Sequence, residues 1–145
     1  MRVFGRTLKD YLWSVKWYVL LCVLVVIFQY DCMLLLMGYD PLVARITQWL
    51  WMLFVAAALV TLVRRYGFES FGVKNILFSG VLFAVIIHGL KAFVFRVFFF
   101  PYAVTAEQQP FVLLYKFFYG SGIVMAVAAA VAMYYYLSRR ERQKG

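Results

Sequence analysis

The sequence contains few charged residues, and acidic residues are the scarcest among them. Only 14% of the 145 residues are charged, against about a quarter in a typical soluble domain. There are 6 Asp and Glu against 15 Lys and Arg. Hydrophobic residues make up 66% of the chain. This composition excludes an ordinary soluble domain and indicates an integral membrane protein.

Histidine and cysteine are also scarce, which limits metal binding and disulfide formation. With one His and two Cys, the chain has no metal-ligand pattern. Cys22 and Cys32 lie in one apolar run, and a helix would separate them by about 15 Å, which is too far for a disulfide. No nucleophile–base set or pair of carboxylates is visible. The sequence therefore predicts a protein that is not an enzyme and that has no metal site and no cofactor.

Long apolar runs are what the chain does contain. Each of four runs has about the 20 residues that a helix needs to cross a bilayer. The runs are residues 18–37, 46–63, 76–100 and 111–137. Pro41 and Pro101 follow the first and third runs, where a helix must end because proline cannot continue it. We predict one all-α domain, residues 1–145, with four transmembrane helices.

The basic residues are divided unevenly between the two ends of these spans. Eleven of the 15 lie before the first span, between the second and third spans, or after the fourth span. Positively charged flanks stay on the cytoplasmic side of a membrane. The sequence therefore predicts a multi-pass protein of the plasma membrane with both termini in the cytoplasm. The role of these basic residues in orienting the spans also explains the net charge of +9, so nucleic acid is not an expected partner.

The residues before the first span have an amphipathic pattern. The apolar positions at helical spacing are Phe4, Leu8, Tyr11, Leu12 and Val15. Basic residues fall elsewhere on the helical wheel. We expect a short interfacial helix on the anionic inner leaflet, with a frayed basic tail as the alternative.

Small residues in the fourth span predict close contact between helices. Gly122, Ala126 and Ala130 form a row at four-residue spacing, which lets two membrane helices approach each other. The row fits packing inside one chain or between chains. Four helices can hardly enclose a large polar path, so we expect a homo-oligomer or a partner membrane subunit.

Polar and ionisable side chains interrupt the first and third apolar runs. Gln29 and Asp31 lie in the first run, and His88, Lys91 and Arg96 lie in the third. An ionisable group at bilayer depth costs on the order of 2.5–3.5 kcal/mol on insertion scales, so these positions are candidate functional sites. Counted along the helices, Asp31 and His88 share a level in the outer half of the bilayer. We expect Asp31 to pair with His88 or Lys91.

These residues divide into two candidate sets. The basic set near the outer interface consists of Lys91, Arg96 and Lys116. Basic side chains between helices suit an anionic headgroup. The deeper set of Gln29, Asp31 and His88 lines a polar route or couples it to protons. The alternatives are contacts that hold helices together and, for Arg96 and Lys116, snorkelling to the outer headgroups.

Two features resemble the GtrA-like family of small membrane proteins with four spans. Asp31 lies within the first span, and Arg64-Arg65-Tyr66-Gly67-Phe68 follows the second. The family has an Asp in the first span and an Asn-x-x-x-x-Arg-Arg-aromatic-x-Phe ending; Leu59 stands at the asparagine position here. Lys116 also resembles a family lysine. The resemblance implies the handling or flipping of polyprenyl-phosphate-linked sugars in the biosynthesis of cell-surface polysaccharides.

Three functions fit these observations. The leading prediction is a protein that binds a polyprenyl-phosphate-linked sugar, or a similar anionic membrane lipid, and transports it across the bilayer as a flippase. The second is a non-catalytic accessory subunit of a larger membrane complex, which agrees with the small size of the chain. The third is a channel or small transporter that forms an oligomer.

Overall fold

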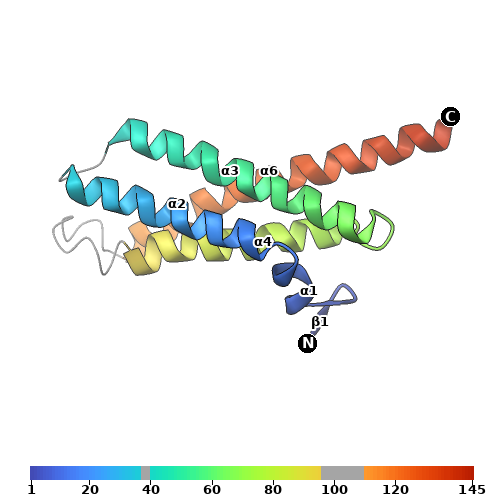
Figure 1. Cartoon of the computed structure of the whole chain (residues 1–145), viewed down its shortest axis with the longest axis horizontal. Coiled ribbons are helices and arrows are strands. Elements are labelled where there is room, and N and C mark those ends of the chain that lie inside the picture. Colours follow the sequence, from blue (N-terminus) through green and yellow to red (C-terminus); the bar gives the residue numbers. More distant parts are fainter. Residues whose placement is uncertain (37–39, 96–109) are drawn as a thin grey trace.

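The computed structural model describes residues 1–36, 40–95 and 110–145. Helices make up almost all of it, after a short hairpin at the N-terminus (Figure 1). The elements are β1 (Arg2–Val3), β2 (Arg6–Thr7), α1 (Leu8–Trp13), α2 (Lys16–Leu35), α3 (Pro41–Tyr66), α4 (Val73–Gly89), the π-helix η1 (Leu90–Phe95) and α6 (Pro110–Lys144).

The four long helices, α2, α3, α4 and α6, lie lengthwise in one bundle (Figure 1). The most extensive contact is between α4 and α6, followed by those of α3 with α2 and with α6. A Cβ atom added to Gly80 of α4 would lie 2.6 Å from the Cβ of Ala128 on α6. Small residues thus let these two helices approach closely. The C-terminal part of α6 extends beyond the rest of the bundle (Figure 1).

The predicted row of small residues is not the row that packs inside the chain. Gly122, Ala126 and Ala130 are exposed on α6. The buried face of the same helix contains Ala128 and Ala132 instead. Among the described residues, nothing packs closely on this row, so contact between chains is the alternative that remains.

The ends of α3 follow from residues that the sequence shows. Asp40 caps the helix, since its carboxylate accepts hydrogen bonds from the backbone N–H groups of Leu42 and Val43. Pro41 occupies the first helical position, where its missing N–H is not needed. Gly67 ends the helix with a φ of 79°, a backbone conformation that side chains disfavour.

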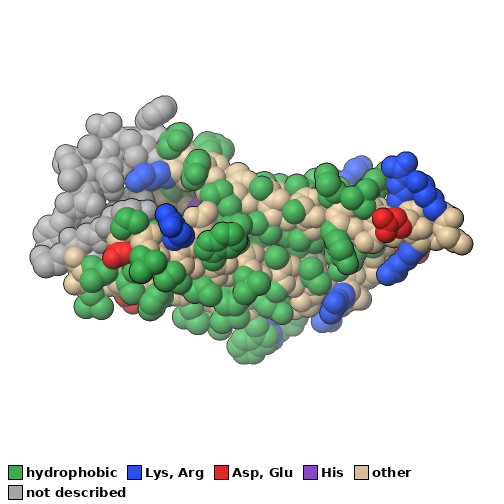
Figure 2. All heavy atoms as spheres, turned by 90° about the horizontal axis from the view of Figure 1, so that it is seen from above, with side chains coloured by type: hydrophobic (Ala, Val, Ile, Leu, Met, Phe, Trp, Pro, Cys, Tyr) green, Lys and Arg blue, Asp and Glu red, His purple; other side chains and the backbone are tan. Residues whose placement is uncertain are grey.

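Three helical stretches are long and apolar enough to cross a membrane: Pro41–Tyr66, Val73–Val94 and Leu114–Lys144. Hydrophobic side chains cover much of the middle of the molecule, and Lys and Arg gather at the C-terminal end (Figure 2). Within the described residues α2 is not one of the three stretches. The predictions of four spans and of cytoplasmic termini therefore stay predictions.

The N-terminal segment differs from the predicted amphipathic helix. Residues 2–7 form an antiparallel hairpin, and its turn has φ angles of 51° at Phe4 and 83° at Gly5. The helix begins only at Leu8, because the Thr7 hydroxyl accepts a hydrogen bond from the Asp10 N–H and the Asp10 carboxylate accepts one from the Thr7 N–H. The bonds that the Thr7 N–H and the Thr7 hydroxyl donate to the Asp10 carboxylate hold the pKa of this carboxyl below its usual value.

The hairpin and α1 are bound to the start of α4 through buried polar contacts. The Tyr11 hydroxyl donates to the Val3 carbonyl at 2.9 Å and accepts from Asn75 Nδ2 at 2.8 Å. Arg6 places its guanidinium 3.8 Å from the centre of the Tyr66 ring. The N-terminal segment is therefore part of the folded unit rather than a frayed tail.

Candidate functional site

His88 lies inside the bundle, where α3, α4 and α6 meet. Its side chain is 5% exposed, and its ring meets the Trp51 ring edge-on, with centroids 5.2 Å apart. On the other side, a Cβ atom added to Gly120 would lie 2.1 Å from His88 Nδ1. Only a glycine at this position of α6 leaves room for the imidazole.

Several buried polar atoms at this part of the bundle have no hydrogen-bond partner among the described residues. They are Gln29 Oε1, Trp51 Nε1, His88 Nε2 and Ser121 Oγ, one from each of α2, α3, α4 and α6. An unpaired buried donor or acceptor costs about 1–3 kcal/mol, and such groups are normally satisfied by protein, ordered water or a ligand. These four atoms are therefore candidates for hydrogen bonds to water or to a bound polar group.

The sequence had singled out two of these four residues. Gln29 and His88 were predicted as intramembrane polar residues, and both are buried. Trp51 and Ser121 were missed. Their residue types are common in membrane helices, so only their position beside His88 and Gly120 draws attention to them.

Asp31 does not lie among these buried polar residues. Its side chain is exposed, whereas the preceding Gln29 and Tyr30 are buried. Among the described residues no hydrogen bond or ion pair between Asp31 and His88 is found, and the expected pairing of Asp31 with His88 or Lys91 stays a prediction. Successive residues of a helix point about 100° apart, so Asp31 lies on a different face of α2 from Tyr30 and Gln29. The Tyr30 hydroxyl donates to the Lys91 carbonyl at 3.0 Å and connects α2 to η1.

Two of the three predicted basic residues lie on adjoining elements. Lys91 is in η1 and Lys116 is in α6; both are half-buried. The elements are in contact, and the rings of Phe93 and Phe117 lie 5.4 Å apart. The third residue, Arg96, lies outside the described residues. Lys91 follows His88 by about one helical turn, at the start of a π-helix, a distortion that is frequent at functional sites.

Comparisons with protein-family models, curated proteins and solved structures found no match to this chain. Its class therefore rests on the structure itself. The three apolar helical stretches define a helical membrane protein. The resemblance to the GtrA-like family stays a prediction.

Proposed function

We propose that the protein binds a membrane lipid with an anionic headgroup, such as a polyprenyl-phosphate-linked sugar, and moves that headgroup across the bilayer. The observation that carries the proposal is the arrangement around His88. Buried polar atoms of four helices have no hydrogen-bond partner among the described residues, and one of them, His88 Nε2, belongs to a residue about one helical turn before Lys91, whose element contacts that of Lys116. In this reading, the lysines hold the phosphate at the outer side of the plasma membrane.

The two lysines and the buried polar atoms around His88 have complementary chemistry. Ammonium groups form charge-assisted hydrogen bonds with phosphate oxygens, and such bonds are about twice as strong as neutral ones. Below them, Trp51 Nε1 can only donate, Gln29 Oε1 can only accept, and His88 and Ser121 do either. Such a set replaces part of the hydration of a sugar or a phosphate. The hydrocarbon chain of the lipid stays outside the bundle, where the apolar surface is exposed.

A second candidate function is favoured by α6. Gly122, Ala126 and Ala130 are exposed along one helix, and such a row suits close contact with another membrane helix. This surface supports an accessory subunit of a membrane complex, or an oligomer of this chain.

Native mass spectrometry of the gently extracted protein tests the two candidates against each other. The lipid-handling proposal predicts a retained isoprenoid phosphate or another phosphate-bearing lipid at a fixed ratio to the chain. Extraction in the same detergent of an unrelated membrane protein of similar size is the control. A stoichiometric foreign subunit with no retained anionic lipid would contradict the proposal and support the accessory role.

A further inference from the structure

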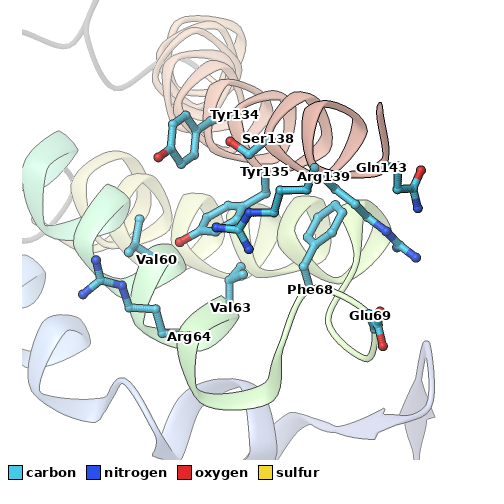
Figure 3. A pocket seen from close by; sticks show the side chains of 11 residues that line it. Val60, Val63, Arg64, Phe68, Glu69, Tyr134, Tyr135, Ser138, Arg139 and Gln143 are labelled. Atoms are coloured by element: carbon cyan, nitrogen blue, oxygen red, sulfur yellow. The ribbon is translucent and has the colours of Figure 1, made fainter. Parts of the chain in front are cut away.

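A groove lies at the opposite end of α3 from Lys91 and Lys116. It has a volume of about 840 Å³ and is enclosed by the end of α3, the residues that follow it, and the C-terminal part of α6 (Figure 3). Three arginines line it: Arg64 from α3, and Arg139 and Arg142 from α6. We call it the arginine groove.

Among the described residues, the lining of the arginine groove has an excess of positive charge. Glu69 is the one carboxylate among its lining residues. Within the described part of the chain, no ion pair involves Arg64, Arg139 or Arg142. Three guanidinium groups around one hollow, with a single carboxylate beside them, attract an anion.

Apolar and aromatic residues form much of the remaining lining of the arginine groove, together with Ser138 and Gln143. Val60 and Val63 line it within the stretch of α3 that is long and apolar enough to cross a membrane. Phe68 stacks on Tyr135 with ring centroids 5.9 Å apart, and the Arg139 guanidinium lies 5.9 Å from the centre of the Phe68 ring. The lining that α3 provides thus changes from apolar at Val60 and Val63 to basic at Arg64, toward the C-terminal end of the helix.

This gradient matches one kind of ligand. A phosphate between the guanidinium groups receives paired hydrogen bonds, because each arginine presents a planar fork of donors. A hydrocarbon chain attached to that phosphate then runs along the valines toward the bilayer interior. A small soluble phosphate would use the arginines and leave the apolar wall unoccupied.

We infer that the arginine groove binds the phosphate-bearing headgroup of a membrane lipid, at the end of the bundle opposite to Lys91 and Lys116. This inference depends on the proposed function only for the identity of the lipid that reaches the groove. With the predicted orientation, the groove faces the cytoplasmic leaflet and holds the headgroup on the side opposite to the lysines.

Arg65 and Arg140 provide a matched control. They adjoin Arg64 and Arg139 in sequence, carry the same charge and do not line the arginine groove. If anionic lipid is attracted only by the overall charge of the surface, replacing either pair of arginines lowers lipid binding equally. If the arginine groove is a specific site, replacing Arg64 and Arg139 lowers lipid binding more.

The test measures binding of the purified full chain to phosphatidic acid in neutral detergent micelles. The reference is the Lys91→Gln/Lys116→Gln protein, so that the other basic set makes no contribution. Arg64→Gln/Arg139→Gln is expected to weaken the binding of phosphatidic acid about tenfold or more, because each substitution removes charge-assisted hydrogen bonds to the phosphate. Arg65→Gln/Arg140→Gln is expected to change it by less than about threefold. Arg64→Lys/Arg139→Lys, which keeps the charge and the fold, is expected to give an intermediate loss because it removes the paired geometry.

A second arm uses inorganic phosphate as the competitor. If the groove recognises a lipid, inorganic phosphate displaces phosphatidic acid only at about a hundredfold higher concentration, because it lacks the apolar contacts. Displacement at equal concentration would overturn the lipid assignment in favour of a soluble phosphate. Equal losses in the two arginine pairs, or no binding by the reference protein, would overturn the site. Neither result bears on the proposal that Lys91 and Lys116 bind a lipid phosphate, which is tested in a separate experiment.

Discussion

Gly120→Ala is expected to lower the free energy of unfolding by about 2 kcal/mol or more, as overpacking of a tight contact does. The new methyl group would lie 2.1 Å from His88 Nδ1. The imidazole has little room to retreat, because the Trp51 ring lies 5.2 Å away on α3. Thermal or denaturant unfolding of the purified protein in one detergent measures this loss.

Gly122→Ala is the matched control on the same helix. A Cβ atom at this position meets nothing within 4 Å, and alanine favours the helix over glycine by about 1 kcal/mol. We expect unchanged or slightly higher stability. In a His88→Ala background, the cost of Gly120→Ala is expected to disappear, because the clashing ring is gone. Equal responses at positions 120 and 122 would contradict the placement of His88.

Lys91→Gln/Lys116→Gln is expected to weaken the binding of polyprenyl phosphate about tenfold or more, since two charge-assisted bonds to one phosphate are lost. Glutamine stays polar but removes the charge. Binding of the uncharged polyprenol is expected to stay the same, because the apolar contacts are unchanged. The comparison uses the Arg64→Gln/Arg139→Gln protein as its reference, so that the arginine groove does not contribute.

Lys9→Gln/Lys74→Gln is the charge-matched control for this experiment. Both lysines are exposed and lie away from η1. Their removal is expected to change binding by less than about threefold, as for screened surface charges. An equal loss in both pairs would show that overall charge, and not a site, attracts the lipid. No loss in either pair would contradict the role of Lys91 and Lys116.

Helix positions and ends were largely predictable, because proline, glycine and the length of apolar runs mark them directly. Pro41 was predicted only to end the first span, but it also begins α3, which runs over Pro41–Tyr66 and not over the predicted residues 46–63. The N-terminal helix was predicted too long, since the spacing of apolar residues outweighed the cap formed by Thr7 and Asp10. A capping residue followed three positions later by its acidic partner was the signal that was missed.

The direction of Asp31 could not be predicted, because α2 is apolar on nearly every side and its pattern does not show which face is buried. Burial of Gln29 and His88 was easier to predict, since neighbouring apolar residues can face lipid while a polar one prefers the interior. The Gly120 contact was not visible, since it depends on how α4 and α6 pack against each other.

The arginine groove was hidden for a similar reason. Arg64 and Arg139 were interpreted as charges that orient the spans, and Arg64 also as part of a motif that resembles a family ending, but neither was predicted to line a groove. They line one groove because the end of α3 lies against α6, and Phe68 stacks on Tyr135 beside them. Contacts between residues so distant in the sequence cannot be read from one sequence.

Translocation of a lipid headgroup in vesicles tests the central proposal most directly. The purified chain is reconstituted into neutral vesicles that contain a polyprenyl-phosphate-linked sugar, and a membrane-impermeant reagent that attacks the sugar reports the fraction facing outward. We predict that the protein makes nearly the whole pool accessible, whereas protein-free vesicles and vesicles with the Lys91→Gln/Lys116→Gln protein expose only the outer leaflet. Accessibility limited to the outer leaflet with the folded wild-type protein would contradict the proposed function.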